Sequence, residues 1–379
     1  MDKVRIGVVG VGGMGQGHCG YLGSLEEVEF TCVCDTNPDT LKSVTEKYSL
    51  PGFATHEELL ASGLADAIII ATPHYFHPPI AIDAFRKGIH VLSEKPIGVT
   101  VGAADAMIAA AKESGCKFSI MYQMRTEPQN IAAKKLITDG LIGDIYRTSL
   151  TMGWYRSQAY YNSGGWRATW AGEGGGVLIN QAPHLLDIFQ WLGGLPAKMT
   201  AQTRTRIHDI EVEDEAFATI EYANGAHGYM YASVIEAPGT NVLEICGDKG
   251  KLRISDGKLE AWSLKTSIRQ FTVENESMWA GPDSEPIAIE LTEGETQHKA
   301  ITRNFVAAIL HDEPLIAPGA EGLNALELIN GFILSGKAGE TVSLPVDREK
   351  YEALMAGLKA TSRLKTDVKD LAETDPHYK

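Results

Sequence analysis

A glycine-rich turn close to the amino terminus constrains this sequence more than any other feature. Residues 10–15 read Gly-Val-Gly-Gly-Met-Gly, between an apolar run at 4–9 and a helical stretch that extends to about residue 24. Glycine permits a tight turn and lets the backbone approach a pyrophosphate, and a helix N-terminus attracts negative charge. The pattern therefore predicts a dinucleotide-binding turn. The expected contact residues are Gly10, Gly12, Gly13, Met14 and Gly15.

Asp35 closes the second apolar run, residues 30–34. A carboxylate at the end of that strand accepts hydrogen bonds from both ribose hydroxyls of an adenosine and repels a 2′-phosphate. No arginine follows in residues 36–39 to offset the repulsion. Asp35 therefore predicts that the cofactor is NAD rather than NADP.

The first third of the chain alternates short apolar runs with amphipathic stretches, a pattern typical of a parallel sheet with crossover helices. The first two strands are expected at 4–9 and 30–34, and the fourth, fifth and sixth at 67–71, 90–92 and 117–121; the third has no assigned range. Helices are expected after Pro38, after the capping box at 55–58 and over 101–113. We predict that residues 1–122 form an α/β Rossmann domain with a doubly wound parallel sheet of six strands.

The periodicity changes after about residue 123, where long alternating segments appear. Residues 216–222 and 227–234 flank Asn224-Gly225, a dipeptide that favours a hairpin. Residues 123–379 are therefore predicted to form an α+β domain with a large, mostly antiparallel open sheet. Helical periodicity returns at about 296–310, 322–334 and 348–358.

The composition narrows the possible partners. The 379-residue chain carries 34 basic and 49 acidic side chains, which gives a formal net charge of -15, so nucleic acid is not an expected partner. No apolar stretch approaches the ~18 residues of a membrane span.

The first residues lack the apolar core of a signal peptide. Five cysteines without metal-ligand spacing predict reduced thiols, a cytoplasmic location and no metal site.

Three further motifs carry a recognisable pattern. They are Ala-Thr-Pro-His-Tyr-Phe-His at 71–77, Glu-Lys-Pro at 94–96, and the segment 174–187. Together with the glycine turn, in this order, they resemble the glucose-fructose oxidoreductase / inositol dehydrogenase / rhizopine-catabolism (Gfo/Idh/MocA) family. The resemblance extends over most of the chain, to about residue 340.

The resemblance implies an oxidoreductase with a site between two domains, where hydride moves between nicotinamide and a sugar or cyclitol carbinol. It implies that Thr72, Pro73 and His77 lie along the dinucleotide and that Glu94 lies near the nicotinamide. It also implies that the open sheet forms a homodimer or homotetramer. Lys95 would bind the reacting hydroxyl, and the bond between Lys95 and Pro96 is commonly cis in this family.

The residues themselves agree with that placement. Lys95 follows a strand at its carboxyl end, where open α/β sheets bind ligands, and a shielded lysine donates readily to a carbinol oxygen. A histidine ordinarily titrates near neutral pH, which suits a group that must take a proton, so we expect His184 to be the principal acid/base. The alternatives are a solvated surface lysine and a satisfied, partly buried histidine. Asn180 and Asp187 would share a helix face with His184, with Asp187 either an orienting residue or a surface carboxylate.

Besides Lys95 and His184, Asn180 is expected to bind the substrate, because its amide can donate to and accept from a sugar hydroxyl. Further candidate substrate contacts lie in two places. The aromatic stretch 154–170 includes Trp154, Tyr155 and Arg167, which suit the faces and hydroxyls of a pyranose. The alternative is an aromatic cluster that seals the sheet or a subunit contact. Arg125 lies at the domain junction, where the family often places an arginine near substrate.

We therefore expect an NAD-dependent dehydrogenase that oxidises a secondary hydroxyl of a sugar or pyranoside, at C3, to a ketone. One alternative is an inositol dehydrogenase, which the resemblance weakens because those enzymes carry aspartate where this chain has Asn180. A second is an NAD-dependent glycosidase that oxidises C3 transiently. A third is a non-catalytic dinucleotide-binding regulator, against which Lys95 and His184 both argue.

Overall fold

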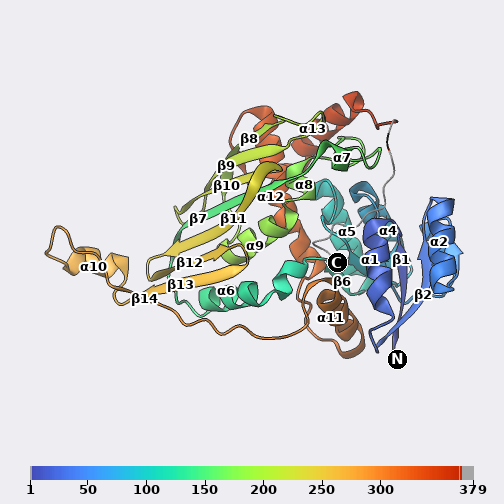
Figure 1. The fold of residues 1–379 in the computed structure, drawn as a ribbon, viewed down its shortest axis with the longest axis horizontal. Coiled ribbons are helices and arrows are strands. Elements are labelled where there is room, and N and C mark those ends of the chain that lie inside the picture. Colours follow the sequence, from blue (N-terminus) through green and yellow to red (C-terminus); the bar gives the residue numbers. More distant parts are fainter. Residues whose placement is uncertain (1, 367, 369–379) are drawn as a thin grey trace.

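The amino-terminal part of this computed structural model, which describes residues 2–366 and 368, is a parallel sheet flanked by helices (Figure 1). Within the described residues the sheet has six strands in the order β3-β2-β1-β4-β5-β6. The strands are β1 (Val4–Val9), β2 (Val28–Cys34), β3 (Gly52–Phe53), β4 (Ala67–Ile70), β5 (His90–Ser93) and β6 (Phe118–Ile120). The helices between them are α1 (Gly13–Leu22), α2 (Pro38–Tyr48), α3 (His56–Ala61), α4 (His77–Arg86) and α5 (Val101–Ser114). The expected Rossmann architecture is confirmed.

Local chemistry explains why these elements form where they do. Every residue of β4 is buried, as expected of a strand covered by helices on both faces. The Asn37 side chain caps α2, and Pro38 occupies the first turn. Thr55 and Glu58 form the expected capping box at α3.

The second part of the chain builds a large mixed sheet. Among the described residues it has nine strands, in the order β14-β13-β12-β11-β7-β10-β9-β8-β15. Its strands are β7 (Ile145–Tyr155), β8 (Lys198–Arg204), β9 (Glu215–Glu221), β10 (His227–Ser233), β11 (Ile235–Gly247), β12 (Gly250–Ser255), β13 (Lys258–Leu264), β14 (Ser284–Pro286) and β15 (Val342–Ser343). Only β7 and β10 pair in parallel within this described sheet. The mostly antiparallel sheet and the hairpin at Asn224-Gly225 are confirmed.

Most helices of the second part lie against this sheet or toward the Rossmann domain, whereas α10 (Ile268–Glu274) projects away from the Rossmann domain, beyond β14 (Figure 1). The other helices of this part are α6 (Pro128–Thr138), α7 (Gln158–Tyr161), α8 (Val177–Asn180), α9 (Pro183–Gly193), α11 (Gln297–His311), α12 (Gly322–Ala338) and α13 (Arg348–Thr361). The sequence pattern missed α6, because only Asn130 and Ala133 of that helix are buried and its periodicity is weak. No helix in residues 2–366 is both long and apolar enough to cross a membrane.

The carboxyl-terminal part of the chain returns to the Rossmann domain. Figure 1 shows a long extended segment that leads from β14 to α11, which packs beside α1 and β1. Further along, the backbone N–H of Ile120 in β6 donates to the carbonyl of Ala317 at 3.1 Å. The two parts of the fold therefore share an extensive contact, and α11 lies next to the helix that follows the glycine turn.

Candidate active site

The glycine turn has the geometry that dinucleotide binding needs. Gly10 adopts φ +85°, in the region that favours glycine, and its N–H donates to the Cys34 carbonyl at 2.8 Å. A Cβ at Gly15 would lie 1.9 Å from the Gly10 carbonyl oxygen, whereas a Cβ at Gly12 would meet nothing within 4 Å. Gly15 therefore permits close packing of α1 on the turn, and Gly12 leaves open space of the kind that the expected approach of a pyrophosphate requires.

Asp35 supports this turn directly. Its Oδ2 accepts from the backbone N–H of Val11 at 2.8 Å, and its Oδ1 accepts from Asn37 at 2.8 Å. Each oxygen retains a second lone pair for a ribose hydroxyl. At the end of β4, the Thr72 hydroxyl is buried without a hydrogen-bond partner among the described residues. These residues fit the expected dinucleotide.

His77 joins two of the loops at this edge of the sheet. Its side chain is fully buried, with Nε2 2.7 Å from the carbonyl oxygen of Thr72 and Nδ1 2.8 Å from that of Pro96. The loop after β4, which includes Pro73, is thereby fixed to the loop after β5. Both ring nitrogens face backbone carbonyls, so His77 fixes the two loops, and its expected place along the dinucleotide stays a prediction.

Lys95 lies at the carboxyl end of β5. The Lys95-Pro96 peptide bond is cis, and Lys95 Nζ donates to the backbone carbonyl of Asn180 at 2.8 Å. Burial lowers the pKa of Lys95, while the carboxylates of Glu94 and Glu173 oppose that shift. The structure therefore places Lys95 inside the protein, beside the second part of the fold, and not on a solvated surface.

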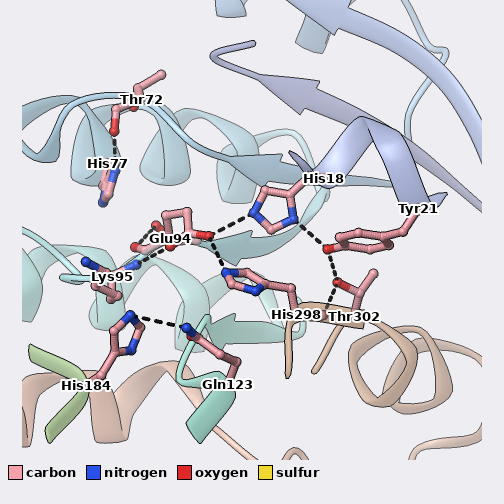
Figure 2. A network of polar contacts seen from close by, with 11 residues as sticks. His18, Tyr21, Thr72, His77, Glu94, Lys95, Gln123, His184, His298 and Thr302 are labelled. Atoms are coloured by element: carbon pink, nitrogen blue, oxygen red, sulfur yellow. Dashed lines mark hydrogen bonds and ion pairs between the residues drawn. The ribbon is translucent and has the colours of Figure 1, made fainter. Parts of the chain in front are cut away.

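Glu94 is the centre of a buried polar network that Figure 2 shows in close-up. Glu94 Oε1 lies 2.8 Å from His18 Nε2 and 3.7 Å from His298 Nε2. Glu94 Oε2 accepts from the backbone N–H of Lys95 at 3.2 Å. Although burial opposes ionisation, the contact with His18 and the nearby cationic groups lower the pKa of Glu94 to about 2. Glu94 is thus an ionised carboxylate within the fold.

His184 lies below Lys95 in Figure 2 and is also buried. The side-chain amide of Gln123 donates to His184 Nε2 at 3.3 Å. Burial lowers the pKa of His184 well below its ordinary value, and the Lys95 cation lowers it further. Lys95 and His184, 89 positions apart in the sequence, therefore meet in one electrostatic environment.

The missing N–H of Pro183 predicts a kink or a helix start near that residue, and a new helix does begin there. Helix α8 ends at Asn180, and α9 begins at Pro183, which cannot donate the N–H that a continuous helix uses. Asn180 therefore does not share a helix face with His184. Its side-chain amide instead donates to Glu173, whose pKa is raised by burial.

Arg125 and Asp187 form a buried ion pair. Arg125 is 1% exposed, and its Nε and Nη2 donate to the two carboxylate oxygens of Asp187 at 2.7 and 2.6 Å. Arg125 also pairs with Glu321. Asp187 is consequently not a surface carboxylate. In this structure Arg125 pairs with carboxylates of the fold, and its expected contact with the substrate stays a prediction.

A cavity of about 660 Å³ opens beside His184. Its wall includes Gln123, Trp154, Tyr155, Arg156, Asn241 and Asp256. Trp154 and Tyr155 belong to the last positions of β7, so they are held by the sheet and do not lie on a loop as expected. Arg167 lies outside this wall, with Nη1 2.9 Å from the Tyr160 hydroxyl and its guanidinium over the Trp166 ring.

Two profiles of one family match this chain. Residues 4–122 match the oxidoreductase family with an NAD-binding Rossmann fold, and residues 131–253 match the Gfo/Idh/MocA C-terminal domain. The chain belongs to the Gfo/Idh/MocA family. This membership confirms the expected fold, the oxidoreductase class and the NAD cofactor.

Individual relatives and solved structures agree with the family. The chain is 28% identical over 271 residues to the 2,7-anhydro-N-acetylneuraminate hydratase of Escherichia coli, covering 69% of this chain and 70% of the relative. It is 25% identical over 271 residues to the D-glucoside 3-dehydrogenase of the same species, covering 65% and 76%. The WlbA dehydrogenase of Bordetella pertussis, solved with NADH and UDP-GlcNAcA, superposes with a TM-score of 0.78 at 29% identity, covering 91% of this chain and all of that one.

Sequence reasoning missed several members of the site. His18 and His298, which flank Glu94, come from α1 and α11, and Gln123 comes from the 3₁₀ helix Gln123–Thr126. The available signal for His18 was its place on the helix that follows the glycine turn. His298 had no local signal, because only the return of α11 to the Rossmann domain brings it near Glu94.

Proposed function

We propose that this protein oxidises a secondary hydroxyl of a pyranoside, at C3, to a ketone with NAD as the hydride acceptor. The observation that carries the proposal is the convergence of Lys95 and His184 on one another, with His184 in the wall of the cavity. The similarity to a relative named D-glucoside 3-dehydrogenase supports the position of oxidation.

In the proposed mechanism two side chains act on the reacting hydroxyl, one as a hydrogen-bond donor and the other as the base. Lys95 donates a hydrogen bond to the carbinol oxygen and stabilises the negative charge that develops there. His184, held neutral by its lowered pKa, accepts the hydroxyl proton at Nε2, where it accepts from Gln123 in this structure. When bound, NAD supplies the nicotinamide carbon that accepts the hydride.

The cavity wall favours an uncharged, hydroxyl-rich substrate. Trp154 and Tyr155 offer aromatic faces for the C–H face of a sugar ring. Of the charged residues in the wall, Glu127 and Asp256 are acidic, and Arg156 is the one lysine or arginine among the described lining residues. Such a wall attracts a diphosphate poorly, so we infer that a neutral glycoside is preferred to a nucleotide sugar.

A substrate panel tests this function. Wild-type protein with NAD is incubated with sugars, inositols, alkyl glucosides and nucleotide sugars, and formation of NADH is followed by its absorbance. The proposal expects the highest kcat/KM for a neutral pyranoside, with a keto group at C3 in the product. Oxidation of inositol alone, or of nucleotide sugars alone, would contradict it.

Nitrophenyl glycosides distinguish the alternative glycosidase. Release of nitrophenol without net formation of NADH would show that the protein is a glycosidase that oxidises C3 transiently. Formation of stoichiometric NADH with the glycosidic bond intact supports the dehydrogenase. A relative named as a glycosyl hydrolase of family 109, 26% identical over 192 residues, makes this comparison necessary.

Replacement of Lys95 tests the proposed machinery. Lys95→Ala is expected to lower kcat by about 100-fold or more, because the hydrogen bond to the carbinol oxygen is lost, while the Kd for NADH stays within about twofold. Lys112→Ala, on the exposed face of α5, is the matched control and should retain wild-type kcat. A Lys95→Ala variant with wild-type turnover would remove Lys95 from the mechanism.

A further inference from the structure

We propose that His18 is a doubly protonated positioning residue that fixes Glu94, and through Glu94 the Lys95 backbone, relative to the helix of the glycine turn. The expected effect of His18 on turnover rests on the proposed function. The protonation of His18 does not, because it can be measured in the protein without substrate. The proposal is carried by an unbroken chain of hydrogen bonds (Figure 2).

The chain begins at Glu94 and ends at the backbone of α11. His18 Nε2 lies 2.8 Å from Glu94 Oε1, and His18 Nδ1 lies 2.5 Å from the Tyr21 hydroxyl. That hydroxyl lies 2.8 Å from Thr302 Oγ1, which in turn lies 2.9 Å from the carbonyl oxygen of His298. Three of these distances are within the normal hydrogen-bond range, and the contact between His18 and Tyr21 is shorter still, so each contact requires one proton.

A count of the available protons decides the state of His18. The ionised Glu94 carboxylate and the His298 carbonyl only accept, so protons must come from His18, Tyr21 and Thr302. A neutral imidazole supplies one, and the two hydroxyls supply one each, which leaves one of the four contacts without a proton. An imidazolium supplies two and satisfies all four. His18 then donates to both Glu94 and Tyr21.

The groups around His18 are compatible with a cation at this position. Burial raises the pKa of Tyr21, so its phenol stays neutral, and raises that of the neighbouring Cys19 to about 12. Burial lowers the pKa of His298 to about 4, so it adds no positive charge at neutral pH. Glu94 supplies the compensating negative charge, and Lys95 is the remaining cation close to that carboxylate.

The arrangement has a mechanical consequence for the active site. His18 lies on α1, three positions after Gly15, and Glu94 Oε2 accepts from the backbone N–H of Lys95. The His18–Glu94 pair therefore ties the pyrophosphate-binding turn to the residue that contacts the substrate oxygen. Tyr21 and Thr302 extend the same connection to α11. Loss of His18 should displace Lys95 while leaving the glycine turn intact.

Selective nitrogen labelling of histidine tests the protonation directly. In the ¹⁵N spectrum of the full-length protein at pH 7.5, the His18 signals, identified by their absence in His18→Gln, are expected at positions typical of two protonated ring nitrogens. A spectrum with one unprotonated His18 nitrogen would overturn the proposal. This readout needs no substrate, so it remains decisive even where the substrate panel detects no turnover and the proposed function fails.

Kinetics test the positioning role. His18→Gln keeps one donor for Glu94, and we expect a fall in kcat of roughly tenfold to 100-fold with the Kd for NADH within about twofold of wild type. Tyr21→Phe, which leaves the His18–Glu94 contact in place, should retain more activity than His18→Gln. The control is His311→Gln, an exposed α11 residue outside the network. Unchanged kcat in His18→Gln, or a loss confined to NADH affinity, would contradict the positioning role.

Discussion

At the scale of single residues, Asp35 supports the fold through both carboxylate oxygens and is also the residue that we predict to recognise the ribose of the cofactor. Both of its oxygens accept backbone N–H groups, one from Val11 in the glycine turn and one from Asn37 at the start of α2. The carboxylate is therefore held in one orientation before any ligand arrives. A fixed carboxylate reads ribose hydroxyls at a small entropic cost and repels a 2′-phosphate.

Asp35→Ala tests this double role. We expect wild-type protein to have a higher kcat/KM with NAD than with NADP, and the variant to lose most of that preference because the repulsion disappears. The Tm of the variant should also fall, since two backbone donors lose their acceptor. Equal kcat/KM values for the two cofactors in the wild type would show that Asp35 does not select between them.

Short-range chemistry explains which residues were predictable. Gly10 and Gly15 belong to one turn of six residues, and Asp35 directly follows the second strand. Because each of these positions is defined by its immediate neighbours in the sequence, a sequence pattern identifies it. Arg125 and Asp187 are 62 positions apart and form an ion pair in the core. A local sequence pattern cannot predict such a pair. The sequence therefore suggested a substrate contact for an arginine that the fold uses as a buried ion pair.

At the scale of elements, that ion pair joins the 3₁₀ helix at the domain junction to α9, which carries His184. Both side chains are almost completely excluded from water. Removal of one charge leaves the other buried with less compensation, and such losses are strongly destabilising. The pair therefore fixes the helix that presents the proposed base.

Asp187→Asn tests the contribution of this pair. We expect a loss of about 3 kcal/mol in the free energy of unfolding, measured by urea denaturation at neutral pH. The matched control is Asp139→Asn, which breaks the exposed pair with Lys135 and should cost less than about 1 kcal/mol. Similar losses in the two variants would indicate that the buried pair has no special role.

Elements were predicted best where periodicity alone defines them. The parallel strands and the hairpin strands β9 and β10 follow directly from apolar runs and alternation. The break between α8 and α9 depends on Pro183, which can be recognised in the sequence. The orientation of the Asn180 side chain, in contrast, depends on its contact with Glu173. That contact forms only when the loop folds, so no periodic pattern in the sequence predicts it.

At the scale of the whole molecule, α11 connects the two parts of the fold. His298 and Thr302 on this helix contact the network around Glu94, although they lie about two hundred positions from it. The network around Glu94 is thus completed by α11, a segment from the last third of the sequence. Docking of α11 should depend on pH through His298.

The direction of that pH dependence follows from the lowered pKa. His298 has a pKa of about 4 in the fold against about 6.5 in an unfolded chain, so between these values the unfolded state binds more protons. Its contribution to stability is therefore complete above pH 6.5 and is lost as the pH falls toward 4, by up to about 3 kcal/mol. His298→Gln should show a shallower decline in unfolding free energy between pH 7.5 and 5 than wild type or His311→Gln. An identical decline in all three would contradict this coupling.

The most direct measurement of the central claim is single-turnover formation of NADH by wild type, Lys95→Ala, His184→Ala and the double variant. If both side chains act on one substrate oxygen, the double variant should lose about as much rate as the slower single variant, because the two residues work as a unit. Losses that multiply, or a wild-type rate in either single variant, would contradict the account.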